Sequence, residues 1–118
     1  MDHFNYSNGI LHAEDVPLSD LAADYGTPFY CYSTATLKRH VEVLSRALDG
    51  LDAHIHFAVK ANGNLGVLAT LAETGIGADV VSIGEMTRAI AAGIPASKIV
   101  FSGVGKTAQE LTAALKSG

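Results

Sequence analysis

The chain has 118 residues, enough for about one small domain, and with 48% hydrophobic and 17% charged residues it has the composition of a folded protein. Its net charge of −4 argues against nucleic-acid or anionic-membrane partners, because both favour basic patches. The single cysteine, Cys31, excludes an intrachain disulfide, and no apolar stretch is long enough to cross a bilayer. The first residues lack the basic segment and apolar core of a signal peptide, so we expect a cytoplasmic protein.

The first part of the chain predicts a hairpin, a helix, a strand and a longer helix. These elements are expected over residues 4–12, 18–25, 29–32 and 35–48. Asn8-Gly9 suits a tight hairpin turn because both residues tolerate positive φ. Gly26 supplies a stop for the first helix, and Ser33 or Thr34 can cap the second.

The rest of the chain alternates strand and helix with a period of about 22 residues. Strands are expected over residues 55–60, 78–81 and 99–102, and helices over residues 65–73, 85–92 and from 108 onward. Ser82 with Glu85, and Thr107 with Glu110, have the spacing of a capping box. Repeated βα units imply right-handed crossovers and a parallel sheet. The fold class is therefore α/β, either the first three units of a (β/α)8 TIM barrel, a fold of ~250 residues, or part of a doubly wound sheet.

The stretch from His54 to Asn64 holds the residue with the clearest chemical potential, Lys60. Alternation along the strand places Ala58 and Lys60 on the face opposite Phe57, with Lys60 as the last residue of the strand. Ligands of α/β proteins lie outside the carboxyl ends of parallel strands. A lysine amine there can form a Schiff base with a carbonyl cofactor or substrate. The alternative is a solvated lysine that ends a strand.

Three other side chains on these strands bear on that hypothesis. Asp79 lies in the next strand, where a charged residue seldom sits without a partner; it could face the lysine or a cofactor, or bond nearby backbone amides. Ala58 leaves room for a flat ring beside Lys60. His54 and His56 share a strand face, but two ligands are too few for a zinc site, so we expect no metal.

A glycine loop, Gly103 to Thr107, follows the third strand and opens a helix. The Walker phosphate-binding pattern fails because Val100 stands where a glycine is required. The dinucleotide pattern G-x-G-x-x-A is met by Gly103, Gly105 and Ala108, but so short a pattern is a weak signal. We interpret the segment as a glycine loop before a capped helix. A small nucleotide-binding α/β module stays open as an alternative.

Three motifs in order resemble the start of the fold-type III pyridoxal-phosphate decarboxylases: FAVKANGN, GADVVSIGEMTRAIAAGI and IVFSGVGKT. The head of the chain resembles the diaminopimelate decarboxylase branch of that family, in the segment NGILHAEDVPLSDLAADYGTPFYCYSTATLKRH. The resemblance implies that pyridoxal 5'-phosphate is held covalently by Lys60, the catalytic residue, with Ala58 and Asp79 also binding the cofactor. It implies a lyase of lysine biosynthesis that removes carbon dioxide from meso-diaminopimelate to give L-lysine. Ser102 stands where many relatives have other residues, often His, and is left out of the predicted site.

The same resemblance implies a domain organisation, a class of substrate and an oligomeric state. Residues 1–32 are expected to contribute to a second, all-β domain, and residues 33–118 to form the first, incomplete part of the cofactor-binding barrel. We therefore expect an N-terminal piece that is inactive alone, with an amino-acid substrate and, at full length, a homodimer. The alternatives within the fold are an ornithine, arginine or carboxynorspermidine decarboxylase, an alanine racemase-like enzyme and a pyridoxal-phosphate carrier.

Overall fold

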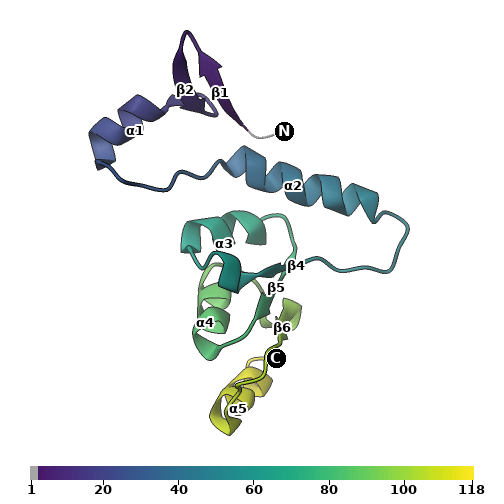
Figure 1. Ribbon diagram of the computed structural model, residues 1–118. Helices are drawn as coiled ribbons and strands as arrows, with labels where there is room; N and C mark the ends of the chain where they lie inside the picture. Colours follow the sequence, from purple (N-terminus) through teal and green to yellow (C-terminus); the bar gives the residue numbers. More distant parts are fainter. Residues whose placement is uncertain (1–2) are drawn as a thin grey trace.

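The computed structural model describes residues 3–118, which form two three-stranded sheets and five α-helices (Figure 1). The antiparallel sheet consists of β1 (Phe4–Ser7), β2 (Ile10–Ala13) and β3 (Val16–Pro17). The parallel sheet consists of β4 (His56–Ala58), β5 (Gly77–Val80) and β6 (Ile99–Phe101). The helices are α1 (Leu18–Tyr25), α2 (Thr34–Ala47), α3 (Leu65–Ala72), α4 (Ile83–Ala91) and α5 (Ala108–Lys116). Two 3-10 turns are η1 (Val59–Ala61) and η2 (Ala96–Lys98).

The hairpin and the first helix are confirmed. Asn8 and Gly9 have φ values of 51° and 79°, the positive values that a two-residue hairpin turn requires. Helix α1 ends before Gly26, whose φ is 76°. The sequence did not predict β3, because a two-residue strand is too short to show an alternating pattern.

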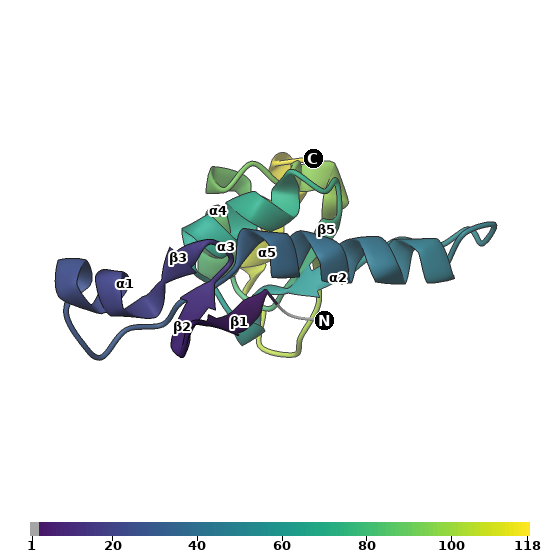
Figure 2. The ribbon, with the colours of Figure 1, turned by 90° about the horizontal axis from the view of Figure 1, so that it is seen from above.

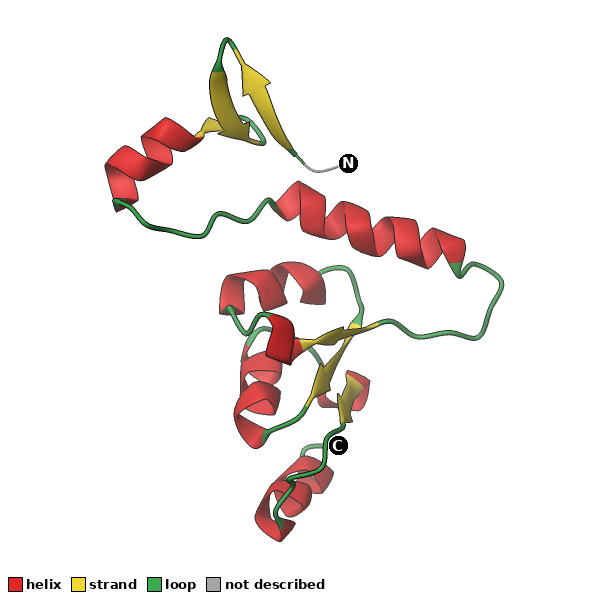
Figure 3. Ribbon diagram, in the orientation of Figure 1, coloured by secondary structure: helices red, strands yellow, loops and turns green. Residues whose placement is uncertain are grey.

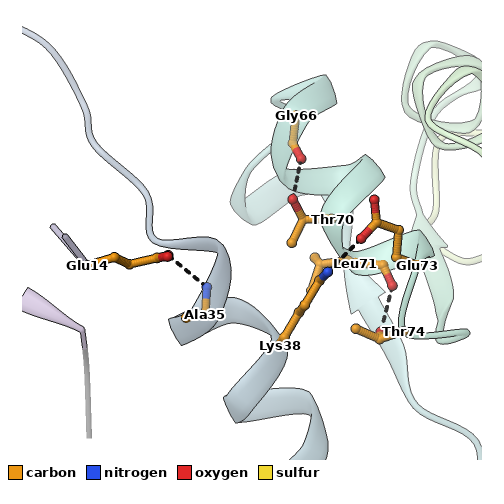
Figure 4. A network of polar contacts seen from close by, with 8 residues as sticks. All are labelled: Glu14, Ala35, Lys38, Gly66, Thr70, Leu71, Glu73 and Thr74. Atoms are coloured by element: carbon orange, nitrogen blue, oxygen red, sulfur yellow. Dashed lines mark hydrogen bonds and ion pairs between the residues drawn. The ribbon is translucent and has the colours of Figure 1, made fainter. Parts of the chain in front are cut away.

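Glu14, which follows β2, links the hairpin to the start of α2 by hydrogen bonds (Figure 4). Its Oε1 accepts hydrogen bonds from the Ser33 hydroxyl at 2.7 Å and from the N–H of Ala35 at 2.9 Å. The Ser33 hydroxyl oxygen in turn accepts from the N–H of Thr36 and so caps the helix, as predicted. The Ala35 N–H, followed by the Ser33 hydroxyl, lowers the pKa of Glu14 below its ordinary value.

The strand expected over residues 29–32 is wrong. These residues are an irregular connection between α1 and α2, drawn as loop in Figure 3. An extended segment becomes a strand only when a neighbour satisfies its backbone groups, and none of the described residues pairs with it. Tyr30 is 90% exposed, and only Cys31 of this segment is half-buried.

The main core lies between the parallel sheet and helices α3 and α4. Register pairs run from Phe57 to Ala78 to Ile99, so their side chains share one face of the sheet, and all three belong to the main core. Figure 1 shows α3 and α4 beside this sheet. The fully buried residues of this core come from both layers: Val59, Leu68, Ala78, Val80, Met86, Ala89 and Ile94. Burial of alternate strand residues therefore fixes which face of the sheet stays open.

Helix α2 lies across the outer side of α3, as Figures 1 and 2 both show. Leu37 and Val41 pack against the cluster that includes Val67 of α3. An ion pair between Lys38 and Glu73, with 2.7 Å between Nζ and Oε2, crosses the same junction (Figure 4). Because both side chains are substantially exposed, the apolar contact supplies most of the stabilisation.

The first parallel strand is shorter than the expected 55–60. Strand β4 stops at Ala58, and η1 follows, closed by a hydrogen bond from the N–H of Asn62 to the carbonyl oxygen of Val59. Val59 is 1% exposed, so the turn keeps an apolar side chain in the core. Lys60 therefore lies in the turn after the strand and not in the strand itself.

The remaining helices begin and end close to the expected residues. Asn64 caps α3, Ser82 caps α4, and Thr107 with Glu110 forms a complete capping box at α5. At α4 the expected capping box is incomplete. The Glu85 carboxylate accepts a hydrogen bond from the N–H of Val81, one residue before the N–H of Ser82 that a capping box uses. The radius of gyration is 17.1 Å, against about 13 Å for a compact domain of about 100 residues, since the hairpin and α1 stand away from the parallel sheet (Figure 1). Residues 3–118 contain no helix with the length and apolar character needed to span a membrane.

Candidate active site

The carboxyl ends of the three parallel strands meet at one edge of the sheet. Ala58, Asp79 and Val100 are register neighbours across β4, β5 and β6, so their side chains share the face opposite α3 and α4. Val100 is 48% exposed on that face. The face thus carries a small residue, a carboxylate and an exposed apolar residue side by side.

Lys60 lies two residues beyond Ala58, in the turn η1 that follows the carboxyl end of β4. Its side chain is exposed, and its amine makes no hydrogen bond or ion pair with residues 3–118. The backbone around it is held, because Val59 is buried and the carbonyl oxygen of Gly63 accepts from the Arg88 guanidinium at 3.2 Å. A primary amine free of partners on a fixed turn can react with an aldehyde.

Asp79 has a side-chain partner that the sequence did not indicate. The Ser102 hydroxyl donates to Oδ1 of Asp79 at 2.5 Å, and both residues are half-buried. Ser102 directly follows β6, and its N–H donates to the carbonyl oxygen of Val80 at 2.9 Å, which extends the ladder by one residue. Aligning the three predicted strands would have brought Ser102 near Asp79. The comparison with other family members left it out of the predicted site.

The two histidines of the first strand have different surroundings. His54 has a side chain that is 83% exposed, and its Nε2 lies 4.0 Å from Oδ1 of Asp52. His56 is half-buried, and its ring occupies the space beside Gly77, where a side-chain methyl group would clash with it. Within the described part of the chain, no three His, Cys, Asp or Glu side chains gather as metal ligands would.

The glycine loop precedes a capped helix, as interpreted from the sequence. The Glu110 carboxylate accepts from the N–H of Thr107 at 2.9 Å and from the N–H of Ile83 at 3.3 Å, so it engages the starts of α5 and α4 together. The N–H and hydroxyl of Thr107, followed by the N–H of Ile83, lower the pKa of Glu110 below its ordinary value. The N–H groups of Thr107 and Glu110 at this helix start are therefore already engaged by the capping box.

The sequence matches the family described as pyridoxal-dependent decarboxylase, pyridoxal binding domain, over residues 34–118. The chain belongs to this family. It is 56% identical over 117 residues to a diaminopimelate decarboxylase of Vibrio cholerae and 51% identical over 118 residues to one of Zymomonas mobilis. Each match covers 98% of this chain and 28% of the relative, so the chain spans little more than a quarter of the length of these relatives. Family membership favours the pyridoxal-phosphate interpretation over a separate nucleotide-binding module.

Solved structures confirm the α/β fold. A crystal structure of an Aquifex aeolicus protein superposes with a TM-score of 0.90 at 46% identity, covering 98% of this chain and 28% of that one. Diaminopimelate decarboxylase of Helicobacter pylori, solved in complex with L-lysine, gives a TM-score of 0.81 at 45% identity, covering 85% of this chain and 25% of that one. The expected resemblance to fold-type III decarboxylases is therefore confirmed at the level of fold and family.

Proposed function

We propose that this chain supplies the lysine-bearing part of a pyridoxal-phosphate carboxy-lyase that converts meso-diaminopimelate to L-lysine and carbon dioxide. One observation carries the proposal. In a member of the pyridoxal-dependent family, an exposed lysine amine follows β4 at the edge where Ala58 and Asp79 are register neighbours.

The residues at this edge fit pyridoxal 5'-phosphate. Lys60 offers a primary amine without a protein partner among residues 3–118, which is the group that an aldehyde requires. Ala58 has only a methyl side chain, so a flat ring meets little obstruction on this face of β4. Asp79 offers a carboxylate whose one oxygen already accepts from Ser102. The amine suits the aldehyde of the cofactor, the small side chain of Ala58 suits its flat ring, and the oriented carboxylate suits a pyridinium charge.

Each residue then has a defined task. Lys60 would hold the cofactor through Nζ. Asp79, kept in place by Ser102, supplies negative charge beside the cofactor, and Ala58 keeps the approach open. The bound cofactor supplies an electron sink for the electron pair that carbon dioxide leaves behind. The protein contributes binding, orientation and charge balance.

The relatives support diaminopimelate as the substrate. Curated proteins that match across 98% of this chain at 51–56% identity are diaminopimelate decarboxylases. A lysine/ornithine decarboxylase of Vibrio vulnificus is only 22% identical and shares the fold alone, with a TM-score of 0.78. A substrate with two amino-acid centres is therefore favoured over ornithine or arginine.

Assembly, location and domain division stay predictions. We infer that residues 1–32 belong with an all-β domain and residues 33–118 with the barrel, which the separate antiparallel and parallel sheets support. We also propose a homodimer and a cytoplasmic location, which only the family resemblance supports.

A competition assay tests the substrate. The purified holoenzyme is given equimolar meso-diaminopimelate, ornithine and arginine, and the amine products and carbon dioxide are quantified. We expect L-lysine to be the main product. Putrescine or agmatine as the main product would overturn the substrate assignment, and no carbon dioxide from any of the three would overturn the decarboxylase function.

A further inference from the structure

Three groups hold the Lys106 side chain over the loop that follows β6. Its Nζ donates to the carbonyl oxygen of Ser102 at 2.9 Å and to that of Gly103 at 2.5 Å, and lies 5.5 Å from the ring centre of Phe101. A lysine ammonium is strongly hydrated and loses side-chain entropy when it is fixed, so a half-buried lysine with two backbone acceptors is unusual. Both acceptors belong to one short stretch of backbone, and Lys106 therefore restrains that stretch.

Strand β5 and the residue after it hold the same loop from the other side. The N–H of Ser102 donates to the carbonyl oxygen of Val80 at 2.9 Å. Gly103 has a φ of 88°, and a Cβ there would lie 3.2 Å from the Cβ of Val81, so only glycine fits without strain. The loop is thus clamped between β5 and the Lys106 ammonium.

The Ser102 hydroxyl is where this clamp reaches the proposed site. Its oxygen donates to Oδ1 of Asp79. A serine hydroxyl has a single side-chain torsion between its oxygen and the backbone, so the position of that backbone sets where the hydroxyl can point. A shift of the Ser102 peptide would carry the hydroxyl away from Asp79 and free the carboxylate to rotate.

We propose that Lys106 is a positioning residue for Asp79. By fixing the Ser102–Gly103 backbone, Lys106 directs the Ser102 hydroxyl onto the Asp79 carboxylate. Lys106 needs no contact with cofactor or substrate for this role. The inference rests on the proposed function, because it matters for catalysis only if Asp79 lies beside a cofactor held by Lys60.

The test compares Lys106→Met, which keeps the alkyl stem but removes the donors, with Lys106→Arg, which keeps charge and donors. Lys116→Met, on the last turn of α5, is the matched control. In the cofactor-free protein, the Ser102 amide should exchange with deuterium about tenfold faster in K106M, because a charge-assisted contact is lost. K106R and K116M should stay near wild type. Unchanged exchange in K106M would overturn the proposal.

Kinetics of the holoenzyme separate positioning from a general structural role. We expect K106M to lower kcat about tenfold with KM nearly unchanged, Ser102→Ala to do the same, and the double variant to be no slower than S102A. If K106M causes the same loss in the S102A background as in the wild-type protein, Lys106 does not act through the hydroxyl, and the proposal is overturned. If K106M does not fold, Lys106→Gln replaces it in both measurements.

One further measurement keeps the two proposals distinguishable. Borohydride reduction of the wild-type protein with pyridoxal phosphate should label Lys60. An unlabelled Lys60 would contradict the proposed function, whereas the exchange rate of Ser102 in the cofactor-free protein still decides whether Lys106 restrains the loop.

Discussion

Replacing Gly77 by alanine tests how tightly the parallel sheet is built under the candidate site. Gly77 is buried at the start of β5, and its N–H donates to the carbonyl oxygen of Ile55 at 2.9 Å. A Cβ at this position would lie well under 3.0 Å from both the carbonyl oxygen of Lys98 and Cδ2 of His56. Real Cβ atoms essentially never show contacts under 3.0 Å, so the neighbours must move.

The cost follows from which neighbours must move. The His56 ring can rotate away, but the Lys98 carbonyl is backbone and can move only with the sheet. Overpacking a buried position costs about 1–3 kcal/mol. Because the clash involves backbone, we expect Gly77→Ala to lower the free energy of unfolding by about 3 kcal/mol. At about 4–8 °C per kcal/mol for a small domain, the midpoint of thermal unfolding should fall by about 10 °C or more.

Thermal unfolding followed by circular dichroism measures this effect. The matched control is Gly84→Ala on α4, where the nearest atom to a new Cβ is the Ser82 hydroxyl oxygen at 3.9 Å; it should be stabilising by up to about 1 kcal/mol, because alanine favours helix over glycine. Adding His56→Ala to G77A should restore only part of the loss, since the Lys98 carbonyl still clashes. A G77A protein that melts within about 2 °C of wild type would refute this account of the sheet.

Three further predictions concern the hydrophobic core, the loss of stability at low pH and the activity of the isolated chain. Leu68→Ala, at a residue that is 0% exposed, should cost about 2–5 kcal/mol in urea unfolding, whereas Leu115→Ala, at one that is 84% exposed, should change stability by less than about 0.5 kcal/mol. Because folding lowers the pKa of Glu110 from 4.5, the ionised carboxylate raises the free energy of unfolding above pH 4.5, and this contribution is lost as the pH falls through the folded-state pKa. In unfolding curves measured over a pH series, Glu110→Gln should therefore lose less stability on acidification than the wild-type protein. The 118-residue polypeptide with pyridoxal phosphate should show no diaminopimelate turnover, because the face that carries Asp79 and Val100 is open, and measurable lysine formation would contradict this expectation.

Local signals in the sequence were sufficient for the helices. The expected range 18–25 is that of α1, because Gly26 ends the helix through its own backbone preference. The capping box of Thr107 and Glu110 likewise acts within four residues and marked the start of α5. Features set by contacts within one turn can be read without knowledge of the tertiary structure.

Features that depend on distant contacts could not be predicted in the same way. Residues 29–32 have strand-forming side chains but no partner strand among the described residues, and so remain irregular. The chain turns after Ala58 into η1, which the hydrogen bond from the N–H of Asn62 to the carbonyl oxygen of Val59 closes, and Lys60 therefore lies in this turn and not in the strand. The bond from Ser102 to Asp79 spans 23 positions and depends on the register of β5 and β6. The candidate lysine could thus be predicted at the carboxyl end of a strand, whereas the Ser102 hydroxyl would have been found only by aligning the predicted strands in their register.

Identification of the residue that carries the cofactor is the most direct test of the proposed function. The protein is incubated with pyridoxal phosphate, reduced with borohydride, digested and mapped by mass spectrometry. We expect the pyridoxyl mass on Lys60, its loss in Lys60→Arg, and its retention in the control Lys116→Arg. A modification on another lysine, with Lys60 unmodified in the wild-type protein, would contradict the account.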